Sequence, residues 1–306
     1  MSDADRGDVV VLGSANMDLV VRQPRRAEPG ETIFGTAFTT GAGGKGLNQA
    51  VAAARAGARV VFLGAVGADA FGERLRQRLV ADGVEVSGLR VSTEATGIAQ
   101  ITVTDDGENT IVVVPGANDD VEFSPDDQAA VAAASHLVVQ GERPIPLLAT
   151  AMRHAREAGV TTVLTPAPAS RDLEALLDLT DLLVPNENEA LELSGSPDAA
   201  EAAARLSRRA GTVIVTRGAH GALVARDGAV VFTLAAPVVT PVDTTAAGDT
   251  FVGVLVAWLA DGAALEVALS AAAAAAAITV TRAGAAESMP HRDEIDRALS
   301  APTSPS

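Results

Sequence analysis

The sequence contains no cysteine and no tyrosine, and only one tryptophan and seven phenylalanines among its 306 residues. The absence of cysteine excludes a disulfide framework and a thiolate metal site. Because so few side chains are aromatic, the core has to be built from Ala, Val and Leu, which suits strands and helices packed closely in layers. The four histidines lie far apart and lack the spacing of metal ligands, so a zinc site is not expected: His136, His154, His220 and His291.

Positive charge is also scarce, since 23 Lys and Arg against 39 Asp and Glu give a formal net charge of -16. A protein that binds nucleic acid or an anionic membrane needs a cationic face, so neither partner is expected. Residues 1–8 lack the basic and then apolar pattern of a signal peptide, and no apolar run has the length of a membrane span. We therefore expect a cytoplasmic protein that holds any bound phosphate by local groups.

Lysine is nearly absent, since Lys45 is the only lysine and stands inside a glycine cluster, Gly41 to Gly46. The chain uses arginine for its ordinary surface charge. Lys45 is either an accident of composition or a position that needs a compact, strongly hydrated point charge, which the planar guanidinium does not supply.

Short apolar segments alternate with helical segments along most of the chain. The first, Asp8 to Gly13, is a β-branched run that ends in glycine, and similar runs follow at 136–139, 161–164, 182–184 and 213–216. This alternation predicts an α/β fold with a mostly parallel central sheet and helices on both faces. No linker divides the chain, so we expect a single domain over residues 1–306.

Two further segments, 19–40 and 96–115, contain strands that fall outside this alternation. The second segment includes a hairpin turn signal at 105–109. We expect these strands to pair into a small lid. Such a sheet is only marginally stable alone, and apolar residues such as Phe34 and Ile101 at its edges favour pairing with a second copy, so a homodimer through the lid strands is expected.

The strongest candidate site is the segment 242–250, Val-Asp-Thr-Thr-Ala-Ala-Gly-Asp-Thr, which an apolar helix follows directly. The small residues Ala246, Ala247 and Gly248 leave backbone N–H groups uncovered at the helix start, which favours binding of an anion such as phosphate. Asp249 would repel an anion, so it is better explained as a base that accepts a proton from a hydroxyl attacking phosphorus. The alternative is that Asp249 only stabilises the first turn of the helix.

The glycine cluster continues to Asn48 and differs from a phosphate-binding P-loop, because Gly46 rather than Ser or Thr follows the lysine. Its glycines allow the backbone to approach a ligand, and Lys45 and Asn48 add donors suited to sugar hydroxyls. Asn16 and Asp18, which follow the first strand, point the same way on extended chain and suit adjacent hydroxyls. The alternatives are a glycine-rich turn and ordinary surface-loop residues.

Two later turns carry polar groups suited to a nucleotide. Residues 185–189, Pro-Asn-Glu-Asn-Glu, follow a strand and open a helix, so an amide and a carboxylate there suit a magnesium ion beside phosphates. An ordinary N-cap is the alternative. Residues 216–221, Thr-Arg-Gly-Ala-His-Gly, follow another strand and fit either a nucleotide contact or a simple turn.

Together and in this order, these stretches resemble the ribokinase (PfkB-type) family of carbohydrate kinases from about residue 9 to residue 299. The motifs that carry the resemblance are Gly-Ser-Ala-Asn-Met-Asp at 13–18, Gly-Gly-Lys-Gly-Leu-Asn-Gln-Ala at 43–50, Pro-Ala-Pro-Ala at 166–169, Pro-Asn-Glu-Asn-Glu-Ala at 185–190 and Val-Asp-Thr-Thr-Ala-Ala-Gly-Asp-Thr-Phe at 242–251. The resemblance implies transfer of phosphate from ATP to a sugar hydroxyl, with ribose as the first candidate, Asp249 as the base and Ala246, Ala247 and Gly248 as the anion hole. It also implies sugar contacts from Asn16, Asp18, Gly44, Lys45, Asn48 and Glu142.

On the nucleotide side, the resemblance implies that Asn186 and Glu189 serve the phosphates and Mg²⁺. It further implies nucleotide contacts from Thr216, Gly218, Gly221 and Gly248, and an activating K⁺ held at Asp243, Thr245, Thr279, Arg282, Gly284 and Ser288. Two positions depart from the family pattern. Thr165 replaces a common Asn, and Ala273 replaces a polar residue that often faces the adenine, so the selectivity for the nucleotide base stays open.

Two other functions compete with ribose phosphorylation. One is a kinase of the same fold for deoxyribose, a ketohexose or a nucleoside, and the other is a non-catalytic sugar-binding protein. The second is disfavoured because a pure binder gains nothing from a base beside an anion hole. The sequence does not rank the sugars, since one hydrogen bond in a polar pocket changes preference by orders of magnitude.

Overall fold

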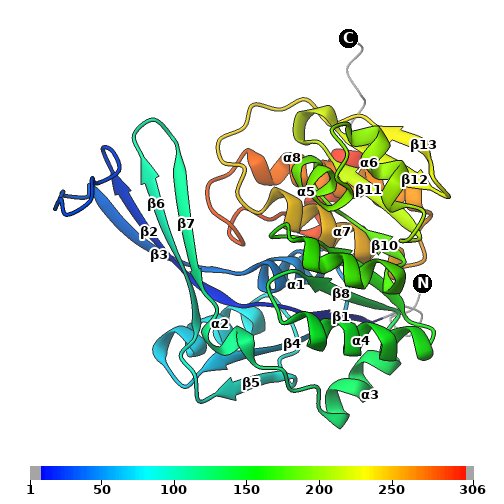
Figure 1. The fold of residues 1–306 in the computed structure, drawn as a ribbon, viewed down its shortest axis with the longest axis horizontal. Helices are drawn as coiled ribbons and strands as arrows, with labels where there is room; N and C mark the ends of the chain where they lie inside the picture. The colour runs from blue at the N-terminus through cyan, green and yellow to red at the C-terminus, as the bar shows by residue number, and fades with distance from the viewer. Residues whose placement is uncertain (1–7, 301–306) are drawn as a thin grey trace.

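The computed structural model describes residues 8–300, which form a layered body from which a smaller sheet projects (Figure 1). The strands are β1 Val9–Leu12, β2 Asn16–Gln23, β3 Ala37–Gly43, β4 Val60–Gly67, β5 Leu89–Ser92, β6 Gly97–Thr104, β7 Asn109–Val114, β8 His136–Gln140, β9 Thr161–Thr165, β10 Leu182–Leu183, β11 Thr212–Thr216, β12 Ala222–Arg226 and β13 Ala229–Leu234. The α-helices are α1 Lys45–Arg55, α2 Ala70–Ala81, α3 Pro125–Ala133, α4 Ile145–Glu157, α5 Glu187–Ser194, α6 Ala199–Leu206, α7 Ala247–Ala260, α8 Leu265–Val280 and α9 Arg292–Ser300. The 3₁₀ turns are η2 Gly116–Asp119, η3 Arg171–Leu179 and η4 Gly218–His220.

The main sheet has nine strands in the order β13-β12-β11-β10-β9-β8-β1-β4-β5. All pairings from β11 to β5 are parallel, which confirms the expected α/β fold with a mostly parallel sheet. The hairpin of β12 and β13 adds two antiparallel strands that the sequence interpretation did not include. Because parallel strands end at the same edge, the turns after β1, β8 and β11 come together there.

Helices cover both faces of the main sheet, and the first strand shows why. Side chains alternate between faces along a strand. Val9 and Val11 therefore pack into a core shared with α1, α7 and α8, whereas Val10 and Leu12 pack into a second core with α4 and α6. The alanine run in α8 lies in the first core, with Ala271 and Ala275 buried.

The smaller sheet has the strand order β3-β2-β6-β7 and stands away from the layered body in Figure 1. Its strands come from the two segments singled out in the sequence, but their limits differ. Residues 32–36 form no strand, while β2 begins at Asn16 and β3 runs on to Gly43. The reason is pairing: Asn16 lies opposite both Gly43 and Gly97, so the sheet starts inside the body and extends outward.

Helix α1 begins at Lys45 and thus takes in the second half of the glycine cluster, residues 45–48. Gly44 precedes the helix with φ 93, a backbone conformation that side-chain-bearing residues rarely adopt. None of the helices between residues 8 and 300 has both the length and the apolar character that a membrane crossing requires.

Candidate active site

The start of α7 carries the candidate anion site. Ala246 has a left-handed backbone with φ 59, which is strained for a residue with a side chain, and α7 follows at Ala247. The Ala247 N–H donates to the Thr244 carbonyl at 3.3 Å, whereas the Gly248 N–H finds no backbone partner among residues 8–300. A Cβ on Gly248 would meet open space. The helix thus offers an unpaired donor at its positive end, as anion binding requires.

The Asp249 carboxylate is buried in the first turn of α7 and is held by two amide side chains from α1. Asn48 Nδ2 donates to one carboxylate oxygen and Gln49 Nε2 to the other, both at 3.0 Å. Gln140 at the end of β8 orients Gln49 by donating to its Oε1 at 2.8 Å. Burial raises the pKa of Asp249, although the Lys45 charge and the two amides oppose this. A carboxylate of raised pKa, fixed in orientation, is suited to accept a proton.

Lys45 and Glu142 meet where α1 begins. The Lys45 backbone N–H donates to Glu142 Oε2 at 3.0 Å, and the Ser14 hydroxyl donates to the same oxygen. Burial lowers the pKa of Lys45, but the carboxylates of Asp249, Glu142 and Glu189 outweigh it, so the pKa is raised and the ammonium keeps its charge. The only lysine of the chain therefore lies among several carboxylates and neutralises part of their charge.

Asn16 and Asp18 lie at the inner end of the small sheet. Asn16 Oδ1 accepts a hydrogen bond from Asn118 Nδ2 at 2.8 Å, and both residues are buried. The Asp18 carboxylate lies against Gly43, where a Cβ would come within 2.4 Å of Asp18 Oδ2. Gly44 is equally restricted, because a Cβ there would lie 2.8 Å from the Asn16 nitrogen. Glycine is needed at both positions, at Gly43 for the close approach of the Asp18 side chain and at Gly44 for the close approach of the Asn16 backbone.

The pKa of Asp18 is raised to about 7, first by burial and then by the neighbouring carboxylates of Glu142, Glu287 and Asp249. The structure therefore brings all the predicted sugar-side residues together. They form one polar group at the edge where β1 and β8 end, facing the start of α7: Asn16, Asp18, Gly44, Lys45, Asn48, Glu142 and Asp249.

A cavity of ≈ 380 Å³ adjoins this group on the side of β11 to β13. Thr216, Gly218 and Gly221 line it together with Ala247 and Gly248, so the predicted nucleotide turn and the anion site open into one space. The rest of the wall is mostly apolar, from β13, the segment 236–241 and α8, and includes Ala273. Such a cavity accommodates a flat apolar group beside a phosphate held at the helix start.

Asn186 and Glu189 have a local role that the sequence left open. They form a capping box at the start of α5: the Asn186 side chain accepts from the Glu189 N–H, and the Glu189 carboxylate accepts from the Asn186 N–H at 2.8 Å. Neither residue lines the cavity. A β-bridge nevertheless places Asn186 beside Thr216, and burial raises the pKa of Glu189 against the opposing effects of Asn186 and Lys45.

The predicted cation residues lie on two segments that meet behind the anion site. The Asp243 carboxylate accepts from the Thr245 N–H at 2.9 Å and from the Gly284 N–H at 3.0 Å. Within residues 8–300, the carbonyl oxygens of Asp243, Thr245, Arg282 and Gly284 accept no hydrogen bond. Free carbonyl oxygens on adjacent segments are the donor type that a monovalent cation takes.

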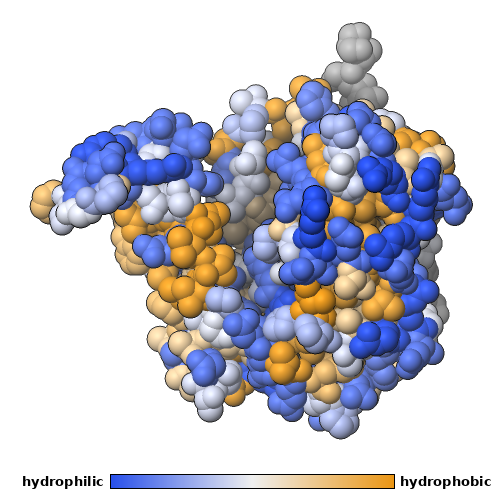
Figure 2. Space-filling model, in the orientation of Figure 1, coloured by the Kyte–Doolittle hydropathy of each residue, from blue (hydrophilic) through white to orange (hydrophobic). Residues whose placement is uncertain are grey.

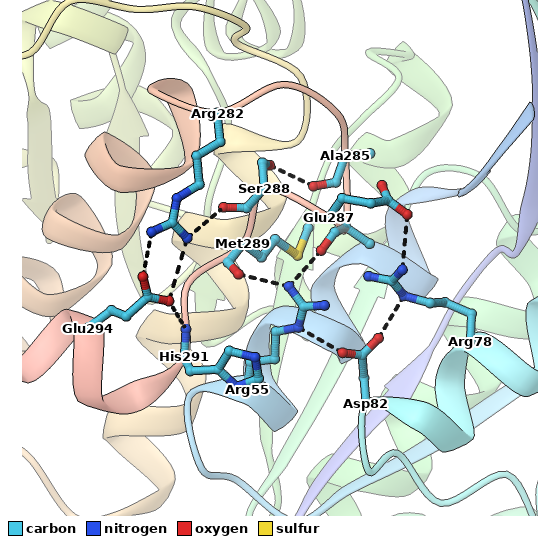
Figure 3. A network of polar contacts seen from close by, with 11 residues as sticks. Arg55, Arg78, Asp82, Arg282, Ala285, Glu287, Ser288, Met289, His291 and Glu294 are labelled. Carbon is cyan, nitrogen blue, oxygen red and sulfur yellow. Dashed lines mark hydrogen bonds and ion pairs between the residues drawn. The ribbon is translucent and has the colours of Figure 1, made fainter. Parts of the chain in front are cut away.

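The other predicted cation residues have partners of their own. The Thr279 hydroxyl donates to the Thr250 hydroxyl at 3.1 Å, and the Ser288 hydroxyl donates to the Ala285 carbonyl at 2.7 Å. Arg282 pairs with Glu294 and contacts the Ser288 carbonyl, as Figure 3 shows. In the described part of the chain, no three His, Cys, Asp or Glu side chains gather closely enough to hold a metal ion.

Sequence reasoning missed several residues that shape the site. Gln49 and Gln140 orient the Asp249 carboxylate, Asn118 orients Asn16, and Ser14 contacts Glu142. A signal for Gln49 was present, because it is a polar residue in an alanine-rich helix directly after Asn48. No local pattern marks Gln140 or Asn118, which reach the site from distant parts of the chain.

The chain is similar to known proteins both in sequence and in structure. The model of the pfkB family of carbohydrate kinases matches residues 6–292. The ribokinase of Haemophilus influenzae is 39% identical over 298 residues, covering 94% of this chain and 97% of that protein, and the ribokinase of Schizosaccharomyces pombe is 40% identical over 309 residues, covering 94% and 96%. The structure of Arabidopsis thaliana ribokinase complexed with ribose and ATP superimposes with a TM-score of 0.89 at 33% identity, covering 96% of this chain and 99% of that one.

Proposed function

This chain belongs to the pfkB family of carbohydrate kinases, and we propose that it transfers the terminal phosphoryl group of ATP to ribose, giving ribose 5-phosphate and ADP. Full-length similarity to ribokinases and to a structure with ribose and ATP supports this substrate pair. The single observation that carries the proposal is the place of the buried Asp249 carboxylate. It lies between the polar sugar-side residues and the unpaired Gly248 N–H, and Gly248 lines a cavity large enough for a nucleotide.

In the proposed reaction, ribose lies among Asn16, Asp18 and the start of α1. Asp249 accepts the proton of the attacking hydroxyl, and Asn48 and Gln49 keep its carboxylate turned toward that hydroxyl. The negative charge that develops on the transferred phosphoryl group is stabilised by the Gly248 N–H and the positive end of α7. Lys45 remains charged and offsets the repulsion among the carboxylates.

On the nucleotide side, we propose that ATP occupies the cavity beside Thr216, Gly218 and Gly221, with its base against the apolar wall. Mg²⁺ bound to the phosphates neutralises part of their charge. Both Glu189 oxygens already accept hydrogen bonds from Asn186, so Glu189 fits a role through water rather than as a direct ligand.

Coupled measurement of ADP release with a panel of sugars tests the proposed function. We expect the highest kcat/KM with ribose, and lower values with 2-deoxyribose, fructose and adenosine. A higher value with another sugar would make the chain a kinase of the same family for that sugar. Sugar binding without sugar-dependent ADP release would instead show a non-catalytic binder.

The affinity for ribose should depend on pH through Asp18. An ionised carboxylate accepts stronger hydrogen bonds from hydroxyls than a protonated one. Because the pKa of Asp18 is about 7, its ionised fraction falls below that pH, and we expect the Kd for ribose to be roughly tenfold higher at pH 6 than at pH 8. Calorimetric titration without nucleotide measures this. The Asp18→Asn variant should bind ribose weakly and with no pH dependence, whereas Asp249→Asn should keep the pH dependence. A Kd for ribose that does not change with pH in the wild type would contradict this role of Asp18.

We propose that K⁺ binds the free carbonyl oxygens near Asp243 and Gly284 and supplies positive charge behind the anion site. We then expect kcat to be at least about tenfold higher in potassium than in a bulky organic cation. Without the ion, less positive charge stabilises the phosphoryl group in the transition state. Exchanging the anion of the salt should have little effect. Equal rates in the two cations would rule this out.

We also propose that the small sheet closes over the sugar and pairs with a second copy. Figure 2 shows apolar surface over β6 and β7, and Ile111 to Val114 are exposed along the edge strand β7. Covering this surface by the same surface of another chain gives a symmetric dimer with one face of each sheet over its own site.

The dimer predicts a mass of about twice 30.9 kDa in light scattering at micromolar concentration. Val112→Asp should raise the dimer Kd by roughly a hundredfold, since it buries an unpaired charge in the interface. Val231→Asp is the matched control, because Val231 on β13 is similarly exposed, at 58% against 55% for Val112, but lies on the other sheet. A monomeric wild type with full kinase activity would contradict the dimer and leave the catalytic assignment standing.

A further inference from the structure

Arg55, the last residue of α1, makes an unusual set of contacts far along the helix from the sugar site (Figure 3). Its Nε donates to Asp82 Oδ1 at 2.7 Å, and its Nη1 donates to the carbonyl oxygens of Ala286 and Met289, both at 2.7 Å. The Arg55 and Asp82 side chains are only 11% and 8% exposed. A rigid planar guanidinium can make all three contacts at once.

The loop that Arg55 holds, residues 284–289, is tied from a second direction by Arg78 on α2. Arg78 Nε contacts the other oxygen of Asp82 at 2.6 Å, and Arg78 Nη1 contacts Glu287 at 2.9 Å. Asp82 therefore orients two guanidinium groups that both reach this loop, as Figure 3 shows. Surface charge alone does not require such an arrangement, because Asp82 is already neutralised by Arg78.

The Asp243 carboxylate links the same loop to the anion site by hydrogen bonds. The Gly284 N–H donates to Asp243 Oδ2, and Asp243 Oδ1 accepts from the Thr245 N–H. Thr245 directly precedes Ala246 and the start of α7. A displacement of the loop would therefore change the position of Asp243 and of the backbone that presents the Gly248 N–H.

We propose that Arg55 is a positioning residue for phosphoryl transfer, which fixes the 284–289 loop and, through Asp243, the backbone of residues 244–248. Helix α1 then acts on the site at both ends: Asn48 and Gln49 orient the base directly, and Arg55 orients the anion hole through the loop. The inference rests on the proposed kinase function. It assigns a role to a residue that contacts neither the sugar nor the nucleotide cavity.

The test compares Arg55→Met with a matched arginine. Met keeps an unbranched apolar stem without the donors, and Arg78 continues to neutralise Asp82. Arg292 is the control, because its Nη1 also donates to a backbone carbonyl at the end of α1, Ala56 at 3.1 Å, and pairs with Asp261 at 2.7 Å. Within residues 8–300 it forms no hydrogen bond or ion pair with the 284–289 loop, and its guanidinium lies over the Trp258 ring near the far end of α7, 3.6 Å from the ring centroid. Arg292→Met thus reports a loss of stability without the link to the anion site.

For Arg55→Met we expect kcat to fall by about 10- to 100-fold, the cost of a small misplacement of catalytic groups, with the Kd for ribose nearly unchanged. Hydrogen exchange of the 243–250 backbone should become faster in this variant and stay at the wild-type rate in Arg292→Met. Arg55→Lys, which has one ammonium for three acceptors, should recover part of kcat.

Three outcomes would overturn the inference: wild-type kcat in Arg55→Met, an equal loss of kcat in Arg292→Met, or unchanged exchange at 243–250. Failure of the kinase proposal itself has a different signature, because the wild type would then show no sugar-dependent ADP release. Exchange at 243–250 can be measured in either case and does not depend on turnover.

Discussion

Replacing Asp249 with asparagine should lower kcat by about 10²–10⁴-fold, the range that general-base catalysis contributes, while leaving ribose affinity close to that of the wild type. The amide has nearly the same shape as the carboxylate but cannot accept the proton of the attacking hydroxyl. The loss reaches the upper part of this range if the carboxylate also orients the hydroxyl, as its fixation by Asn48 and Gln49 indicates.

Single-turnover kinetics with saturating ribose and ATP measure this loss without interference from product release. Gln49→Ala is the informative companion, because it keeps the base but removes one of its two orienting donors. It should lose less activity than Asp249→Asn. Unchanged turnover in Asp249→Asn would remove this residue from its role, whatever the other variants do.

Gly248→Ala should give a stable but nearly inactive protein. Apart from the adjoining backbone, no atom of residues 8–300 lies within 4 Å of a Cβ at this position, so the fold should tolerate the methyl group. That open space belongs to the cavity, where the methyl group would lie at the entrance to the anion site. The Gly248 N–H itself remains, but the methyl group would keep the phosphoryl oxygen away from it. We expect a loss in kcat like that from removing one preorganised anion donor, about 10²–10³-fold.

Gly253→Ala, four residues beyond Asp249 on the same helix, is the contrasting control. Its Cβ would lie 2.6 Å from both Ala52 Cβ and the Gln49 carbonyl, where α7 packs against α1. This substitution should lower the free energy of unfolding by roughly 1–3 kcal/mol, because the core is overpacked there, whereas Gly248→Ala should leave it nearly unchanged. Denaturant titration beside kcat separates the two. A destabilised Gly248→Ala, or an active one, would show that the site does not lie where the cavity places it.

Much of the fold was predictable because it depends on local pattern. The continuous apolar run Val9 to Leu12 contributes side chains to two cores on opposite faces of the sheet, and the repeated strand and helix segments imply a parallel arrangement. The place of Asp249 at a helix start was predictable because an apolar helix directly follows the segment 242–250. A carboxylate after three small residues is unexpected for a simple anion site, and its role as the base stays a prediction.

The parts that were not predictable depend on contacts between distant segments. Gln140 reaches Gln49 across 91 residues of sequence, and Arg55 reaches Met289 across 234. No pattern within either segment specifies such a partner. The antiparallel strands β12 and β13 were also missed, although both are apolar runs joined by a short turn, because the expected alternation allowed only parallel strands separated by helices.

The dual character of some residues also limited the sequence interpretation. Asn186 and Glu189 fit both a phosphate site and a helix cap, and the structure uses them as a cap. Sequence alone does not separate the two, because both need a short polar side chain followed three residues later by a carboxylate. If the two residues help to hold Mg²⁺ as proposed, they have to do so while they keep the hydrogen bonds of the cap.

The most direct measurement is identification of the product formed from ribose and ATP by ³¹P NMR, run side by side for the wild type and Asp249→Asn. We expect the wild type to convert ribose into a phosphate ester at the 5-hydroxyl, with one ADP for each ester, and the variant to form it at least about a hundredfold more slowly. ADP formation without a sugar phosphate, or equal rates of ester formation by the two proteins, would contradict the proposed function and its catalytic base.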